Sequence, residues 1–88
     1  MTDWSRDEIR EVILDTIATI APETDVEALD PGKPLREQVD LDSFDFLNVI
    51  VRLHERLGIG IPESDYGEFA TLESAIAYLA RRMAPRDS

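Results

Sequence analysis

Apolar residues recur with a helical period in three stretches of the chain, and strand-like alternation is absent. Ser5 and Glu8 have the spacing of a capping box, which marks a helix start. Trp4 and Ile9 occupy the two positions of a hydrophobic staple. Behind this start the apolar positions line one helical face: Ile9, Val12, Ile13, Ile17 and Ile20. Pro22 ends the pattern, because proline does not continue a helix.

The second stretch runs from Ser43 to Leu57 and ends before Gly58, a residue suited to a helix C-terminus. Its apolar stripe consists of Phe46, Leu47, Ile50, Leu53 and Leu57. Three further apolar residues widen this surface beyond one face: Phe44, Val49 and Val51. A surface helix needs only one apolar face. We therefore expect the core or a partner protein to use the additional one.

The third stretch begins at Thr71, a plausible N-cap, and repeats apolar residues at Leu72, Ala75, Ile76, Leu79, Ala80 and Met83. Before it, the segment from Glu63 to Phe69 predicts no more than a turn or two of helix. The predicted fold is all-α: a small four-helix bundle with three long helices, one short helix and a long first loop.

That loop lies between Ala21 and Asp42 and is rich in proline. Long unstructured loops are uncommon in small domains, so we expect apolar residues to anchor this one: Leu29, Leu35 and Val39. One helical turn is possible between Val26 and Leu29.

Length and charge narrow the functional classes. The 88 residues predict one domain, residues 1–88, without room for a catalytic cleft on a separate scaffold. The net charge of −10 disfavours nucleic acid and anionic lipid, and favours a protein with a basic patch. The chain has no cysteine, so any thiol chemistry must come from an added group. It shows neither a secretory leader nor a bilayer-spanning apolar run, and we expect a cytoplasmic protein without stable membrane insertion, and a monomer.

Ser43 is the candidate site residue, because it places a hydroxyl at the positive end of a helix. A phosphodiester there would be stabilised by free backbone N–H groups. Without further information, a simple N-cap role is the better interpretation. His54 is the only histidine and is interpreted as a solvated surface residue. Asp40, Asp42 and Asp45 lack the glycine and the closing glutamate of a calcium loop, so we expect no dedicated metal site.

The stretch DSFDFLNVIVRLHERLGIGIPESD, residues 42–65, resembles the modification helix and following loop of acyl carrier proteins. The resemblance continues through TLESAIAYL, residues 71–79, and covers the whole chain in length and helix order. It implies that a phosphopantetheinyl transferase attaches 4′-phosphopantetheine to Ser43. It also implies that the protein is a carrier without enzymatic activity, and that it holds acyl groups as thioesters.

Carried over to this chain, Asp42 and Asp45 match acidic positions that flank the attachment serine. Three features depart from the family pattern: Phe44 replaces a leucine, Asn48 replaces an acidic residue, and the second half of the helix carries Arg52, His54 and Arg56 among few acids. We expect the partner-recognition residues to be Asp42, Phe44, Asp45, Asn48 and Arg52. We expect Phe46 to fill space between helices, and the candidates for an acyl pocket are Phe46, Leu47 and Ile50.

The resemblance also implies partner enzymes of fatty acid, lipid or polyketide-type biosynthesis. These are an acyl carrier synthetase, a ketosynthase or an acyltransferase with a basic docking patch. The departures favour a specialised carrier with its own partners. Two alternatives stay open: an aminoacyl or peptidyl carrier, and an unmodified acidic adaptor, which modification of Ser43 would distinguish from a carrier.

Overall fold

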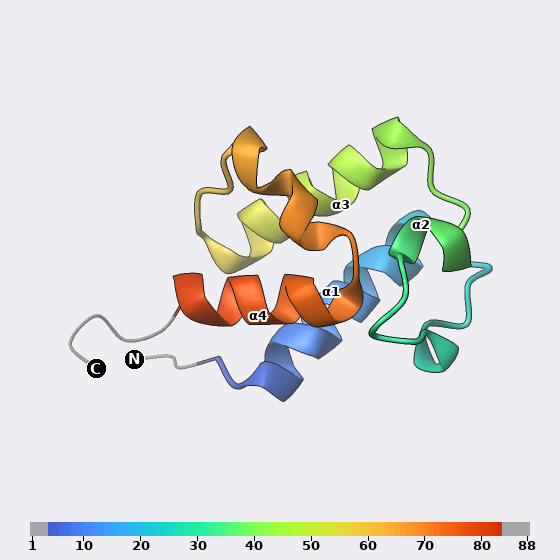
Figure 1. Ribbon diagram of the computed structural model, residues 1–88, viewed down its shortest axis with the longest axis horizontal. Helices are drawn as coiled ribbons and strands as arrows, with labels where there is room; N and C mark the ends of the chain where they lie inside the picture. The colour runs from blue at the N-terminus through green and yellow to red at the C-terminus, as the bar shows by residue number, and fades with distance from the viewer. Residues whose placement is uncertain (1–3, 84–88) are drawn as a thin grey trace.

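Three long helices and several short ones make up the computed structural model of the protein (Figure 1). It describes residues 4–83. Residues 1–3 belong to the segment on which the expected cytoplasmic location was based, and they lie outside the described residues. The elements follow in the order α1 (Arg6–Ile20), η1 (Val26–Ala28), α2 (Leu35–Gln38), α3 (Ser43–Leu57), η2 (Glu63–Phe69) and α4 (Leu72–Arg82). The predicted all-α fold is confirmed.

Local sequence signals place the ends of the long helices. The Ser5 side chain caps α1, and Glu8 completes the capping box by accepting from the Ser5 backbone N–H at 2.9 Å. Thr71 caps α4, where Ser74 takes the place that Glu8 has in α1. Gly58 follows α3 in the left-handed conformation, with φ of 70°. The three predicted helix boundaries are therefore confirmed by the capping geometry.

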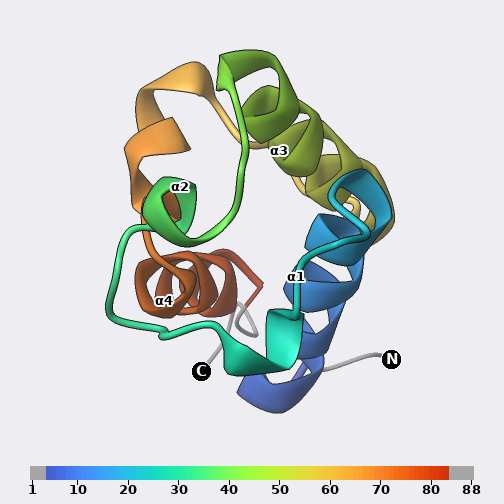
Figure 2. The same cartoon turned by 90° about the vertical axis from the view of Figure 1, so that its right-hand side faces the viewer.

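The core lies where α1 packs against α3 and α4 (Figure 2). The pattern predicted Ile9, Ile13 and Ile17 on the buried face of α1, and all three are at most 1% exposed. It missed Leu14 and Thr16, which are equally buried. Thr16 satisfies its hydroxyl by donating to the Val12 carbonyl at 2.7 Å, which lets a polar residue occupy the core.

The long first connection is anchored as predicted, because Leu29, Leu35 and Val39 are all buried. It also forms two short helices, η1 and α2, of which only the first was expected. Backbone contacts fasten it to the end of η2 and the start of α4: Leu35 N–H donates to the Ala70 carbonyl at 2.8 Å, and Glu73 N–H donates to the Pro31 carbonyl at 2.9 Å. These bonds hold the loop that leads to α3.

The buried stripe of α3 differs from the predicted one. Val49, Ile50 and Leu53 are at most 4% exposed, whereas Leu47 is 39% exposed. The assignment of Leu47 to the inner stripe was wrong, because Val49 takes the inner position at the contact with the neighbouring helices. Within residues 4–83, no helix is long and apolar enough to cross a membrane.

Candidate functional site

Ser43 is the first residue of α3 and is exposed. The N-cap is Asp42, whose carboxylate Oδ1 accepts a hydrogen bond from the Asp45 backbone N–H at 2.8 Å. The Asp42 carbonyl accepts from the Phe46 N–H at 2.9 Å and starts the helical ladder. The interpretation of Ser43 as a simple N-cap was therefore wrong. Because Asp42 caps the helix, the Ser43 hydroxyl is not needed for that purpose.

The surroundings of Ser43 suit a phosphate group. The first N–H groups of a helix have no intrahelical acceptor, and the helix dipole places partial positive charge there. Ser43 begins a helix of 15 residues, long enough for its peptide dipoles to add up. A phosphodiester on the Ser43 oxygen would lie beside these donors, so the residues present fit a phosphopantetheine arm.

Arg36 of α2 supports the segment that leads to Ser43. Its Nε donates to the Leu41 carbonyl at 3.3 Å, and its guanidinium carbon lies 5.9 Å from the centre of the Phe46 ring. Leu41 itself is buried. Arg36 thus connects α2, the approach to Ser43 and the first turn of α3. This role could not be predicted, since nothing in the sequence spacing links Arg36 to Phe46.

An apolar stripe runs along the outside of α3. Phe44, Leu47 and Val51, here called the outer stripe, are 72%, 39% and 40% exposed. Their spacing of three and four residues puts them on one helical face. Of the other residues predicted for partner recognition, Asp42 and Arg52 are exposed, while Asp45 and Asn48 are partly exposed. Asp42, Phe44 and Asp45 therefore surround Ser43 at the start of α3, and the outer stripe extends from Phe44 along the helix.

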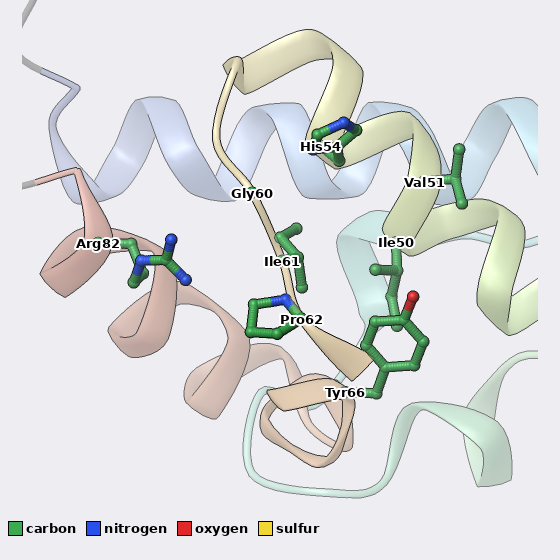
Figure 3. Close-up of a pocket in the computed structure, with 8 residues that line it drawn as sticks. All are labelled: Ile50, Val51, His54, Gly60, Ile61, Pro62, Tyr66 and Arg82. Carbon is green, nitrogen blue, oxygen red and sulfur yellow. The ribbon is translucent and has the colours of Figure 1, made fainter. Parts of the chain in front are cut away.

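A groove of about 520 Å³, here called the side groove, opens between α3, the loop after it and α4 (Figure 3). Its apolar lining comes from Ile50, Val51, Ile61 and Pro62, and its polar lining from His54, Tyr66 and Arg82. A smaller hollow of about 280 Å³ includes Phe46, and Tyr66 lines both. Among the three residues predicted for an acyl pocket, Ile50 and Phe46 line these hollows, whereas Leu47 lies on the outer stripe.

A polar network fixes one end of the side groove. The Tyr78 hydroxyl donates to Asp65 Oδ2 at 2.6 Å, and Arg82 Nη1 donates to the Tyr78 oxygen at 2.7 Å. Arg82 also forms an ion pair with Asp65 at 3.8 Å. Burial, together with the hydrogen bond to Asp65, raises the pKa of Tyr78, so its hydroxyl stays protonated and can donate. The network ties η2 to α4.

His54 is exposed, and its Nδ1 is hydrogen bonded to the backbone oxygen of Ile59. Because a carbonyl oxygen only accepts, Nδ1 carries the proton in this arrangement. No group of three or more potential metal ligands gathers within the part of the chain that the structure describes.

Comparison with known proteins identifies a matching family and several relatives of this chain. The family described as "Phosphopantetheine attachment site" matches residues 11–79. An acyl carrier protein of Rubrobacter xylanophilus is 32% identical over 73 residues, which cover 80% of this chain and 90% of the relative. One from Acidothermus cellulolyticus is 30% identical over 78 residues, covering 86% and 89%. One from an Arthrobacter species is 29% identical over 58 residues, covering 66% and 72%.

Proposed function

The chain belongs to the phosphopantetheine attachment family of acyl carrier proteins, which are carriers and not enzymes, and we propose that Ser43 bears its 4′-phosphopantetheine arm. One observation carries the assignment: Ser43 is an exposed hydroxyl at the first position of α3, while the neighbouring Asp42 makes the capping bond. An unmodified adaptor would need no such free hydroxyl.

In the proposed modification, the Ser43 oxygen attacks a phosphorus of the coenzyme A pyrophosphate. An oxygen–phosphorus bond forms, the pyrophosphate linkage breaks, and the adenosine bisphosphate leaves. The serine proton passes to a base of the transferase. Backbone N–H groups at the start of α3 then stabilise the phosphodiester. When attached, the arm supplies the thiol, absent from the chain itself, on which acyl groups are held as thioesters.

The test is intact-mass measurement after incubation with coenzyme A and a broad phosphopantetheinyl transferase. The native protein should gain one phosphopantetheinyl group, and Ser43→Ala should gain none. Ser64→Ala is the matched control, because Ser64 is also exposed but lies in η2, and this variant should be modified normally. Modification of Ser43→Ala, or failure of several transferases on the native chain, would contradict the assignment.

Partner enzymes are proposed to dock over the start of α3. The acids Asp42 and Asp45 suit a basic patch on the partner, and the outer stripe suits an apolar surface beside that patch. The proposed partners are the transferase and an acyl carrier synthetase, ketosynthase or acyltransferase of fatty acid, lipid or polyketide-type biosynthesis. A cytoplasmic location is part of the same proposal.

A specialised pathway fits the charges of the second half of α3. Arg52, His54 and Arg56 stand there, and Arg56 is held by Asp15 of α1 at 2.7 Å. Partners that require a continuous acidic helix would meet the positive groups of Arg52 and Arg56 there. We therefore propose enzymes dedicated to this carrier, and place their selectivity at Phe44, which is large and 72% exposed directly after Ser43.

A further inference from the structure

The side groove lies on the same face of α3 as Ser43. Ile50 and His54 follow Ser43 by seven and eleven residues, and at 3.6 residues per turn both lie within about 20° of it around the helix axis. The rise of the helix puts them about 10 and 16 Å further along. A fully extended phosphopantetheine arm covers a comparable length. An arm attached to Ser43 can therefore bring its thioester to the side groove.

The protein interior beneath the groove is filled by side chains. Four large residues from α3, η2 and α4 are at most 2% exposed: Leu53, Phe69, Leu72 and Leu79. Inserting a long alkyl chain among them would displace packed neighbours, which costs free energy. A bound cargo therefore lies in the groove itself and meets the groups that line it.

Those groups include a cation. Arg82 extends from α4 toward the loop that carries Gly60, Ile61 and Pro62, on the side of the groove across from His54 (Figure 3). Its hydrogen bond to Tyr78 uses one of the five guanidinium N–H donors, and the contact with Asp65 is longer, at 3.8 Å. The Arg82 side chain is also 38% exposed. Donors thus remain for a ligand in the groove.

We propose that this carrier takes an acyl group whose far end is a carboxylate, and that Arg82 binds this carboxylate. This inference rests on Ser43 as the proposed attachment site. The apolar wall of Ile50 and Ile61 contacts the methylene groups, while the guanidinium makes a charge-assisted hydrogen bond to the terminal oxygen atoms. A purely alkyl chain would cover the guanidinium without replacing the hydrogen bonds that it makes to water, which is unfavourable.

The test compares hexanoyl and adipoyl cargo, which have the same number of carbons and differ in the terminal methyl or carboxylate. Each is loaded from its coenzyme A thioester by a broad transferase, and intact mass confirms loading. In the native protein, adipoyl should shift the Arg82 Nε–H resonance and raise the melting temperature by roughly 3 °C above that of the hexanoyl form. Hexanoyl should leave the Arg82 resonance in place.

Two variants should change the difference between the cargoes in opposite directions. Arg82→Gln should abolish the difference between the two cargoes, and Asp65→Asn should enlarge it, because the competing carboxylate is gone. Arg81→Gln is the control, since Arg81 is an exposed arginine of α4 outside the lining of the side groove. Equal behaviour of the two cargoes in the native protein, or a difference that survives in Arg82→Gln, would overturn the inference alone. Absence of loading would instead contradict the attachment site.

Discussion

The two faces of α3 carry similar side chains in opposite surroundings. Val49, Ile50 and Leu53 on the inner face are at most 4% exposed, whereas the outer stripe is at least 39% exposed. The apolar residues of both faces recur at helical spacing, so the sequence pattern alone does not separate them. The inner face packs in the core, and the outer stripe lies beside Ser43 and stays partly exposed.

The difference shows that apolar residues at helical spacing can serve either folding stability or partner binding. A helix in a small bundle needs one buried face for stability. Apolar residues beyond that face gain less from folding and favour aggregation, so a contiguous exposed group is typical of a binding surface. In α3 the inner face holds the fold together, and the outer stripe remains available for partner enzymes.

Leucine-to-alanine substitutions on the two faces should give the largest contrast. Leu53→Ala removes a fully buried side chain and should lower the free energy of unfolding by about 2 to 5 kcal/mol. Leu47→Ala is the same change on the outer stripe and should cost less than about 1 kcal/mol. Urea denaturation measures both. Similar losses for the two variants would show that the faces are not energetically distinct.

The C-terminal end of α3 should respond to a smaller change. Gly58→Ala should destabilise the protein by about 1 kcal/mol, because an alanine at φ of 70° is strained. An added Cβ meets no atom within 4 Å at Gly58 or at Gly60, and Gly60 lacks a positive φ. Gly60→Ala is therefore the matched control and should be nearly neutral. Equal melting temperatures for the two variants would remove the role of backbone strain.

Repulsion between the acidic residues should lower the stability of the whole protein and should not distinguish the two faces of α3. With a net charge of −10 and extents of 39 × 25 × 21 Å, most pairs of charges lie within the Debye length of about 30 Å at 0.01 M salt. Raising the salt to 0.15 M should increase the melting temperature by screening the repulsion. Magnesium should act in the same direction. An unchanged melting temperature across this range would show that the acids are arranged without net repulsion.

Phe44→Leu should have the smallest effect on stability and a selective effect on function. Since Phe44 is 72% exposed, the free energy of unfolding should change by less than about 0.5 kcal/mol. Loading by a dedicated partner should fall relative to loading by a general acyl carrier synthetase. Rates measured side by side give this ratio. If the ratio is the same for native and variant protein, selectivity lies elsewhere, with Asn48, Arg52 and Arg56 the next candidates.

Much of the fold could be predicted from local signals. The capping residues Ser5 and Thr71, the C-terminal Gly58 and the anchoring Leu35 and Val39 act within a few residues of their own element, so spacing alone reveals them. Periodicity also placed most of the core. It could not assign Leu47 and Val49 to the correct sides, because a helix that is apolar on two faces fits the core in more than one rotation.

The side groove could not be predicted, because it depends on contacts between distant segments. Arg82 and Tyr66 belong to different elements and meet α3 only after folding. Likewise, Asp65 and Tyr78 are 13 residues apart and are joined by a side-chain hydrogen bond with no spacing rule. Ser43 was found through family resemblance, while the fact that Asp42 caps the helix in its place required the structure.

The most direct test of the account is to find which tryptic peptide carries the modification, by mass spectrometry. Cleavage after Arg36 and Arg52 releases residues 37–52, in which Ser43 is the only side chain with a hydroxyl group. After treatment with coenzyme A and a transferase, this peptide should gain the mass of one phosphopantetheinyl group. A gain on any other peptide, or on none, would contradict the assignment of Ser43 as the attachment site.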